Sequence, residues 1–222
     1  MNITSHRSPQ GAIPGQHRSD VTLNRWTRRP WFGAIAVTIS LWALSAASVV
    51  AAGPEKPLAV DQQAPDFDLP VQGQDDYVSL SDLAKQGPVV VIVLRGYPGY
   101  QCVICTRQVG SLLNRANALA AATGNQPRRV VLIYPGPAEK LERHANAFFG
   151  SRKMPETFVV VRDPEMKLIS EWGLRWDDNR ETAYPAAYLI GPGRRVKWAK
   201  VSDSHAGRAS VDDILKAIKN NL

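Results

Sequence analysis

The hydrophobic pattern of the chain predicts three buried strands that alternate with helices. Runs of mostly apolar residues, rich in β-branched ones, cover positions 89–94, 130–134 and 157–161. Runs of this length and composition are typical of strands buried on both faces. Each run is followed by apolar residues at helical spacing, and the pair Asp163-Pro164 is expected to start the third helix. Strands that alternate with helices favour a sheet that contains parallel strands.

A hairpin is predicted before the first of these runs. Positions 64–70 alternate between apolar and polar residues, as an edge strand does, and 77–80 is its expected partner. Ser81 is expected to cap a short helix, which Gly87-Pro88 ends.

A second hairpin is predicted near the carboxyl end. Its strands cover 184–190 and 196–201, joined by a turn at 191–193, and Ser210 is expected to cap a last amphipathic helix. The full order of elements is a thioredoxin-type layout. We therefore expect a thioredoxin-like α/β fold with three layers, in which helices flank a central mixed β-sheet.

The only two cysteines in the sequence, Cys102 and Cys105, lie where the strand 89–94 ends and a helix begins. The chain turns there through Pro98-Gly99. The first turn of a helix presents unpaired N–H groups and a partial positive charge, so a thiol placed there has a lowered pKa. A second thiol three residues later is placed to close a disulfide with the first. This pattern predicts a redox-active pair.

Other interpretations of the cysteine pair are less well supported. A purely structural Cys102–Cys105 disulfide would close a short loop, which contributes little stability through chain entropy. A zinc site needs further ligands, and no histidine shows ligand spacing beside the pair. Haem attachment needs a histidine directly after the second cysteine, where Thr106 stands. A non-enzymatic metal-binding module remains as an alternative, although no metal is expected.

The amino-terminal segment resembles an export signal. Residues 1–30 are polar and without periodicity, and are expected to be disordered. Positions 31–52 are apolar and uncharged, follow Arg28-Arg29 and end in small residues, which predicts cleavage near Ala52. An uncleaved membrane anchor is the alternative, since about 20 apolar residues span a bilayer. Either route places the domain outside the cytoplasm, in the periplasm or an equivalent compartment, where disulfides persist.

The charge of the chain argues against nucleic-acid binding. The formal net charge is +7, but residues 1–52 carry five arginines against one aspartate, which leaves only +3 for the rest. The remaining charges are interspersed, not clustered, so no basic surface for nucleic acid is predicted. After the leader, 53–63 is expected to be a linker and 64–222 the thioredoxin-like domain.

The region from Ala64 to Val201 resembles the peroxiredoxin branch of the thioredoxin superfamily, the alkyl hydroperoxide reductase and thiol-specific antioxidant family. The resemblance rests on Ala-Pro-Asp-Phe-Asp-Leu at 64–69, Val-Ser-Leu-Ser-Asp-Leu at 78–83, Val-Arg-Asp-Pro at 161–164 and the cysteine turn. Peroxiredoxins carry Pro-x-x-x-Thr-x-x-Cys. Pro98 and Cys105 fit this pattern, with Cys102 in the place of the threonine.

The resemblance implies a thiol-dependent antioxidant peroxidase. In this register Cys105 attacks a hydroperoxide, Cys102 resolves the sulfenic acid as a disulfide, and an external dithiol reductant resets the pair without any cofactor. The chain departs from the family at two places. Gln108 stands where an acidic residue often follows, and Pro185 stands where peroxiredoxins place an arginine before the strand that follows it.

Pro185 is what thioredoxins and exported thiol–disulfide reductases carry at that place. Their register makes Cys102 the nucleophile and a protein disulfide the substrate, so this alternative stays open. Arg95 is a candidate for stabilising a thiolate or binding a peroxide oxygen, or else a solvated residue at the strand end. Tyr97, like Tyr100, either donates a hydrogen bond near the sulfurs or simply packs. The polar loop 176–180 is expected to lie beside the site.

Overall fold

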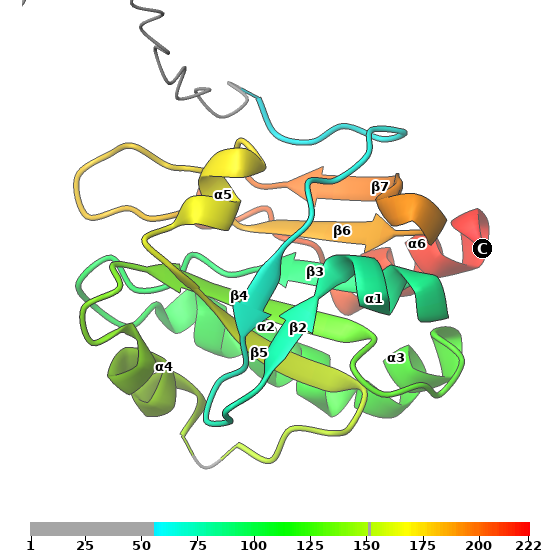
Figure 1. Ribbon diagram of the computed structural model, residues 1–222, viewed down its shortest axis with the longest axis horizontal. Coiled ribbons are helices and arrows are strands. Elements are labelled where there is room, and N and C mark those ends of the chain that lie inside the picture. The colour runs from blue at the N-terminus through cyan, green and yellow to red at the C-terminus, as the bar shows by residue number, and fades with distance from the viewer. Residues whose placement is uncertain (1–55, 151) are drawn as a thin grey trace, which may run out of the picture. The chain divides into compact units, whose positions relative to one another are not determined.

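The computed structural model describes residues 56–150 and 152–222. Its centre is a five-stranded mixed sheet in the order β5-β4-β3-β6-β7, as Figure 1 shows. The strands are β3 (Val89–Val93), β4 (Val130–Gly136), β5 (Phe158–Pro164), β6 (Ala186–Ile190) and β7 (Val196–Val201). Strands β3, β4 and β5 are parallel, and β6 and β7 are antiparallel to their neighbours. The predicted mixed sheet is confirmed.

The central strand β3 separates two hydrophobic cores, because successive side chains of a strand point to opposite faces. Val89, Val91 and Val93 belong to one core, and Val90 and Ile92 to the other. All five side chains are buried. This two-sided burial is why the run contains no polar residue.

Helices cover both faces of the sheet, which makes the three layers expected from the sequence. One face carries α2 (Val103–Asn114), α3 (Ala116–Ala122), α4 (Leu141–Phe149) and α6 (Val211–Asn221). The other carries α1 (Leu80–Gln86), α5 (Lys167–Glu171) and a hairpin of β1 (Asp68–Pro70) and β2 (Tyr77–Ser79). A short 3-10 turn, η1 (Pro192–Arg194), joins β6 to β7.

Several element boundaries differ from the prediction for local reasons. Helix α1 begins two residues earlier than expected because Ser79, and not Ser81, is its cap: the Ser79 hydroxyl accepts from the Asp82 N–H at 3.4 Å. The helix after the cysteines is two helices, α2 and α3, separated at Arg115, whose backbone is not helical. The cap at Ser210 is confirmed, with a reciprocal bond from the Ser210 N–H to the Asp213 carboxylate.

The helix predicted to start at Asp163-Pro164 begins later, because both residues still belong to β5. The buried Asp163 carboxylate nevertheless holds that helix. It accepts from the N–H groups of Leu168 at 3.0 Å and Ile169 at 3.1 Å, near the start of α5. The residue therefore caps α5 from the preceding strand.

The expected disordered region 1–30 and the signal or anchor at 31–52 lie outside the described residues. Within the described part of the predicted linker, Leu58 is buried in the core and the Asp61 N–H donates to the Val196 carbonyl at 2.8 Å. Among residues 56–150 and 152–222, no helix is both long and apolar enough to cross a membrane.

Candidate active site

The two cysteines lie at the carboxyl end of β3, after a turn that is pinned to the neighbouring strand. The N–H of Tyr97 donates to the carbonyl of Pro135 in β4 at 3.0 Å. Gly96 makes this approach possible, since its φ is +78° and a Cβ there would lie 1.9 Å from the Pro135 oxygen. The turn is therefore fixed where the chain passes from the sheet to the cysteines.

Cys102 is the cap of α2, and Cys105 lies in the first turn of that helix. The Cys102 sulfur accepts from the Cys105 backbone N–H at 3.3 Å. Both are free thiols in the structure. Cys102 is 5% exposed and Cys105 is completely buried. The predicted placement of the pair at a helix start is thus observed, with Cys102 on the solvent side.

An arginine from a distant part of the chain, Arg208, contacts both sulfurs. Its Nη1 lies 3.2 Å from the Cys105 sulfur, and its Nη2 lies 3.7 Å from the Cys102 sulfur. Gln108 accepts from the same Nη1 at 2.8 Å, and the His205 carbonyl accepts from Nε at 3.1 Å. The residue precedes α6 and is more than a hundred positions from the cysteines, so no local pattern indicated it.

These contacts set the two thiol pKa values far apart. The pKa of Cys102 is lowered to about 5, first by the hydrogen bond from the Cys105 thiol and then by the Cys105 N–H and the charge of Arg208, against the opposing effect of burial. The pKa of Cys105 is raised, because its thiol donates to Cys102 and because it is buried. At neutral pH the negative charge therefore resides on Cys102.

Arg95 is buried, so it is not a solvated residue at the end of the strand. It forms an ion pair with Glu181, and it donates to the Tyr100 hydroxyl at 2.6 Å and to the Arg180 carbonyl at 2.7 Å. It also contributes, less than the groups named above, to the lowered pKa of Cys102. The loop predicted to lie beside the site thus does so through its last residue, Arg180.

Glu181 connects this arginine to the segment that carries Arg208. Its second carboxylate oxygen lies 3.0 Å from Nε2 of His205. His205 also packs against Trp176, with ring centroids 5.3 Å apart. Sequence reasoning assigned nothing to Glu181 or His205. A lone glutamate and a lone histidine in separate loops carry no signal until the fold brings them together.

Of the two roles considered for Tyr97, the structure supports packing. Its ring stacks on His144 with centroids 3.6 Å apart and planes 10° from parallel. Behind it, Tyr134 donates to Gln101 at 2.9 Å, and Gln101 donates to the His144 carbonyl at 2.9 Å. These contacts anchor the residue just before Cys102 to α4.

The two prolines considered for the site lie at the same end of the sheet as the cysteines. Pro98 is half-buried in the turn before Cys102. Pro185 is buried directly before β6, whose Ala186 pairs with Val93 of β3. The Pro185 carbonyl accepts from the Ser202 N–H at 2.8 Å, which holds the start of the segment that leads to Arg208.

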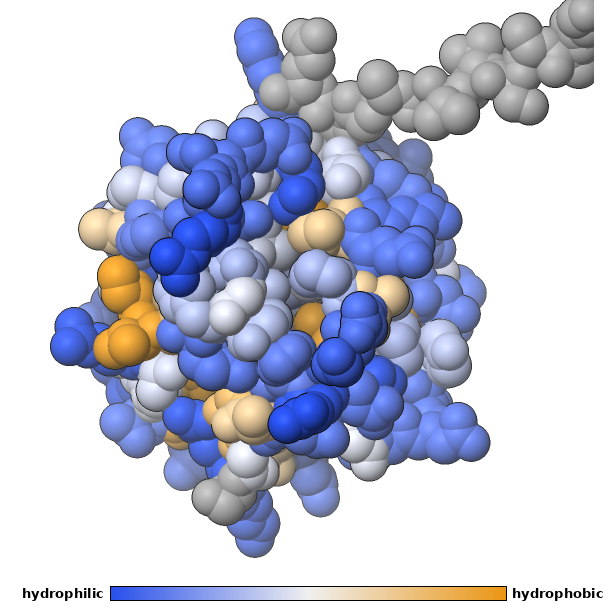
Figure 2. Space-filling view, turned by 90° about the vertical axis from the view of Figure 1, so that its left-hand side faces the viewer, coloured by the Kyte–Doolittle hydropathy of each residue, from blue (hydrophilic) through white to orange (hydrophobic). Residues whose placement is uncertain are grey.

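The side of the molecule that carries these carboxyl ends is mostly polar. The arrowheads of β3 and β5 point to the left in Figure 1, and Figure 2 views the molecule from that side. Hydrophobic atoms appear there only as small, separate patches. Beside the cysteines, the exposed apolar side chains are Val103, 65% exposed, and Tyr100, 36% exposed. Among the described residues, no cluster of three His, Cys, Asp or Glu side chains could hold a metal ion.

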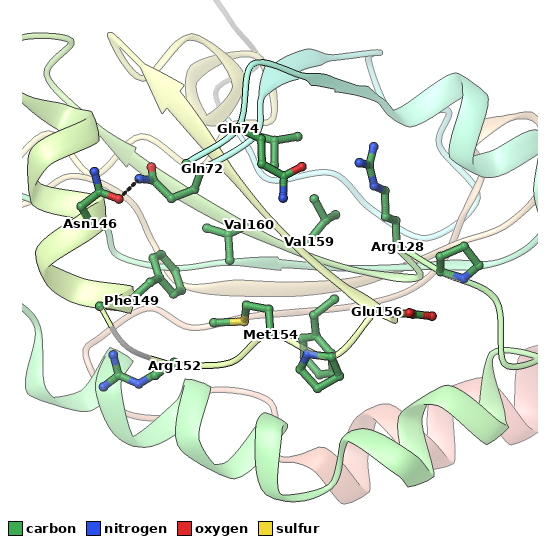
Figure 3. A pocket seen from close by; sticks show the side chains of 16 residues that line it. Gln72, Gln74, Arg128, Asn146, Phe149, Arg152, Met154, Glu156, Val159 and Val160 are labelled. Carbon is green, nitrogen blue, oxygen red and sulfur yellow. Dashed lines mark hydrogen bonds between the residues drawn. The ribbon is translucent and has the colours of Figure 1, made fainter.

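A hollow of about 480 Å³ lies along β5 and does not include the cysteines. Figure 3 shows its lining, in which Gln72 donates to Asn146 of α4 at 2.7 Å. Arg128 on its rim is already paired with Asp76 at 2.7 Å. Its lining contains no cysteine, serine or threonine, so the hollow offers no candidate nucleophile.

Solved structures of peroxiredoxins share this fold. Reduced Prx3 from Vibrio vulnificus aligns with a TM-score of 0.59 at 15% identity, over 73% of this chain and 99% of that one. The reduced 2-Cys peroxiredoxin of Plasmodium vivax aligns with a TM-score of 0.54 at 21% identity, over 73% and 81%. Peroxidoxin BcpB from Mycobacterium tuberculosis gives 0.52 at 19%, over 73% and 97%. The Vibrio protein has also been solved with hydrogen peroxide.

The sequence itself matches one family model. The comparison with curated proteins finds no match. The model of the AhpC/TSA family matches residues 60–199, which include both cysteines, Arg95 and Pro185. Together with the fold, this match confirms the resemblance found in the sequence. The chain belongs to the AhpC/TSA family and is a peroxiredoxin-like, thiol-dependent oxidoreductase of the thioredoxin superfamily.

Proposed function

We propose that this protein reduces hydroperoxides with Cys102 as the attacking thiolate and Cys105 as the resolving thiol. One observation carries this assignment: the Cys102 sulfur accepts from the Cys105 N–H and lies beside Arg208, whereas Cys105 is completely buried. A thiolate, and not a thiol, is the nucleophile in such reactions. The assignment reverses the roles that the peroxiredoxin register implies, because the place of the family's threonine is here the cap of α2.

The proposed cycle has three steps. The Cys102 thiolate attacks the terminal oxygen of the hydroperoxide, the O–O bond breaks, and the leaving alkoxide or hydroxide takes a proton from water. The sulfur of Cys105 then attacks the Cys102 sulfenic acid, so that an S–S bond forms and water leaves. An external dithiol reduces the disulfide and is itself oxidised to a disulfide.

Peroxiredoxins have an arginine before the strand that corresponds to β6, and this chain has Pro185 there. In our proposal Arg208 provides the positive charge instead. In this proposal it holds the Cys102 thiolate through Nη2 and remains beside Cys105 through Nη1. Its planar group has several donors, so it can hold both sulfurs at once.

Single-cysteine variants test this assignment. Reduced Cys105→Ser should consume hydrogen peroxide stoichiometrically in stopped-flow measurements and retain a sulfenic acid that a trapping reagent labels at position 102. Reduced Cys102→Ser should react no faster than free cysteine. Labelling of Cys105 in Cys102→Ser, with no reaction in Cys105→Ser, would show that Cys105 attacks the hydroperoxide, as the peroxiredoxin register implies. No fast consumption by the wild type would refute the peroxidase function.

A second candidate function is thiol–disulfide exchange with protein disulfides, again with Cys102 as nucleophile. Exposed Val103 and Tyr100 beside Cys102 favour it, because they offer a small apolar contact for a partner chain. The otherwise polar surface in Figure 2 favours a small substrate instead. Formation of a mixed disulfide with a protein substrate by Cys105→Ser but not by Cys102→Ser, without fast peroxide consumption, would establish this candidate.

We also propose that the protein is exported through residues 31–52 and cut near Ala52. Support for this comes from the sequence alone, in the arginine pair before an uncharged apolar segment. Expression of the full chain, cell fractionation and amino-terminal sequencing test it. A soluble exported protein that starts near Gly53 supports cleavage. Retention of residues 31–52 in the membrane fraction supports an anchor, and an unprocessed cytoplasmic chain contradicts both.

A further inference from the structure

A small groove adjoins the cysteine pair on the flank of α2. It has a volume of about 250 Å³ and lies between the first turns of α2 and the cap of α6. Its apolar wall comes from Ile104 and Leu112 on one side and from Ala209 and Val211 on the other. Pockets for drug-sized ligands begin at about 300 Å³, so this groove suits a smaller molecule.

The charged groups of this groove are all positive. Arg107 and Arg208 line it, and no carboxylate does. The acids nearest in sequence have partners elsewhere: Asp212 pairs with Arg115 at 3.2 Å, and Asp213 with Lys200 at 2.9 Å. Among the described residues, the exposed side chain of Arg107 makes no hydrogen bond or ion pair. The groove therefore combines an apolar wall with the unpaired charge of Arg107, whereas the charge of Arg208 faces the sulfurs.

The groove shares its residues with the reactive sulfurs. Ile104 lies between the two cysteines in sequence, and Arg208 is in contact with both sulfurs. Gln108, which accepts from Arg208, also lines the groove. Neither cysteine lines the groove, but a molecule bound there lies beside the arginine that contacts both sulfurs.

We propose that this groove binds the anionic end of the substrate, and that the preferred hydroperoxides are short, amphipathic and carry a carboxylate. The carboxylate pairs with Arg107, and the carbon chain lies on Ile104, Leu112 and Val211. This inference rests on the proposed peroxidase function. Arginine is suited to the task because its planar group recognises carboxylates with two parallel hydrogen bonds.

Binding of an unreactive probe tests the groove without any turnover. Octanoate should bind the reduced wild-type protein in isothermal titration calorimetry, and methyl octanoate should not. Arg107→Gln should lose most of the octanoate affinity. Arg143→Gln removes an equal charge from an exposed arginine of α4, outside the groove, and should retain it. The proposal is overturned if octanoate does not bind, or if both variants lose it equally.

Kinetics test the substrate class. A short hydroperoxy carboxylic acid should oxidise the reduced wild type about fivefold faster than its methyl ester does, as one partly exposed charged contact allows. This preference should fall toward unity in Arg107→Gln and persist in Arg143→Gln. Equal rates for acid and ester overturn the substrate class while the peroxidase function stands. Octanoate binding without consumption of either hydroperoxide refutes the peroxidase function and the substrate class, and leaves an anion site established.

Discussion

Cys102 and Cys105 hold one proton between them at neutral pH, and the contacts of each sulfur decide which one carries the charge. Cys102 accepts a backbone hydrogen bond at the start of α2, whereas Cys105 is buried and donates. Arg208 lies beside both. The difference between the two thiols therefore arises from local geometry, not from the residue type.

Replacing Arg208 tests its part in this difference. Arg208→Met keeps much of the side-chain volume but removes the charge, so the pKa of Cys102 should rise by roughly one unit. Absorbance of the thiolate at 240 nm, followed against pH in the reduced protein, measures this shift. Arg115→Met, which removes a charge far from the sulfurs, should leave the titration unchanged. An identical titration in Arg208→Met and the wild type would show that Arg208 does not lower the pKa of Cys102.

At this scale the sequence predicted the cysteine pair and its helix start, because both depend on neighbours in the chain. It did not predict Arg208 or Glu181. Their contacts join segments that lie far apart in sequence, and arginine and glutamate are most often surface residues. Arg95 was a candidate, but only the fold showed that it is buried and paired with Glu181.

Between the elements, one carboxylate holds two loops beside the sulfurs. Glu181 pairs with Arg95, which also donates to Tyr100. It pairs as well with His205, in the segment that carries Arg208. Arg95 cannot reach water if this partner is lost, because it is only 1% exposed. We therefore expect the ion pair to contribute to the stability of the site, unlike an exposed ion pair on the surface.

Glu181→Gln should reduce the free energy of unfolding by about 3 kcal/mol, since it leaves a buried arginine without its counter-charge. Urea unfolding measures the change. Glu139→Gln removes an exposed carboxylate paired with Lys140 and should cost less than about 1 kcal/mol. Equal effects of the two substitutions would contradict the role given to Glu181.

The ion pair between Arg95 and Glu181 should make the protein less stable in acid. Burial works against ionisation of Glu181, but hydrogen bonds from Arg95 and His205 outweigh it, so its pKa is lowered from 4.5. A lowered pKa stabilises the fold above the unfolded value, and this stabilisation is lost as the pH falls below about 4.5. Glu181→Gln should show a smaller loss over this range than the wild type. A parallel loss in both proteins would contradict the prediction.

The turn before the cysteines depends on a single glycine. Gly96→Ala places a Cβ 1.9 Å from the Pro135 carbonyl oxygen and keeps a positive φ. The conformation alone should cost about 1 to 3 kcal/mol, and the clash adds to it. Gly110→Ala, in the middle of α2 with open space around it, should instead stabilise by up to about 1 kcal/mol. Thermal unfolding compares the two, and a neutral Gly96→Ala would show that the turn is not constrained.

The strands were predicted more accurately than the helix boundaries. Apolar runs locate β3, β4 and β5, because most positions on both faces of each strand are buried, although β4 and β5 extend two and three residues beyond the predicted ends. Helix ends depend on which of several similar residues the fold selects. Ser79 and Ser81 are both suitable caps. The backbone is not helical at Arg115, between α2 and α3, although arginine has a high helix propensity.

For the whole molecule, the structure combines a peroxiredoxin fold with a cysteine pair in the arrangement that thioredoxin-type enzymes use. The family was visible in the sequence because its motifs lie in contiguous segments. Which of the two cysteines attacks first was not visible in the sequence, because in our proposal this depends on Arg208 and on which cysteine the fold buries. The groove beside α2 likewise exists only where α6 meets the cysteine helix.

The ionised sulfur should also make the stability of the whole reduced protein depend on pH. The pKa of Cys102 is about 5 in the fold and near 9 in the unfolded chain, so the unfolded chain binds more protons between these values. Stability of the reduced protein should therefore rise as the pH increases from about 5 toward 9. Denaturant unfolding against pH measures it, and Cys102→Ser should show a flatter profile. A wild-type profile as flat as that of the variant would contradict an ionised Cys102.

The central claim is that Cys102 is the ionised and attacking thiol of the pair. Alkylation of the reduced wild-type protein with limiting iodoacetamide at pH 6, followed by mass spectrometry of the modified peptide, tests this most directly. The account predicts rapid modification at Cys102, close to its rate at pH 8, with Cys105 unmodified. Preferential modification of Cys105, or reaction of both thiols as slowly as free cysteine at pH 6, would contradict it.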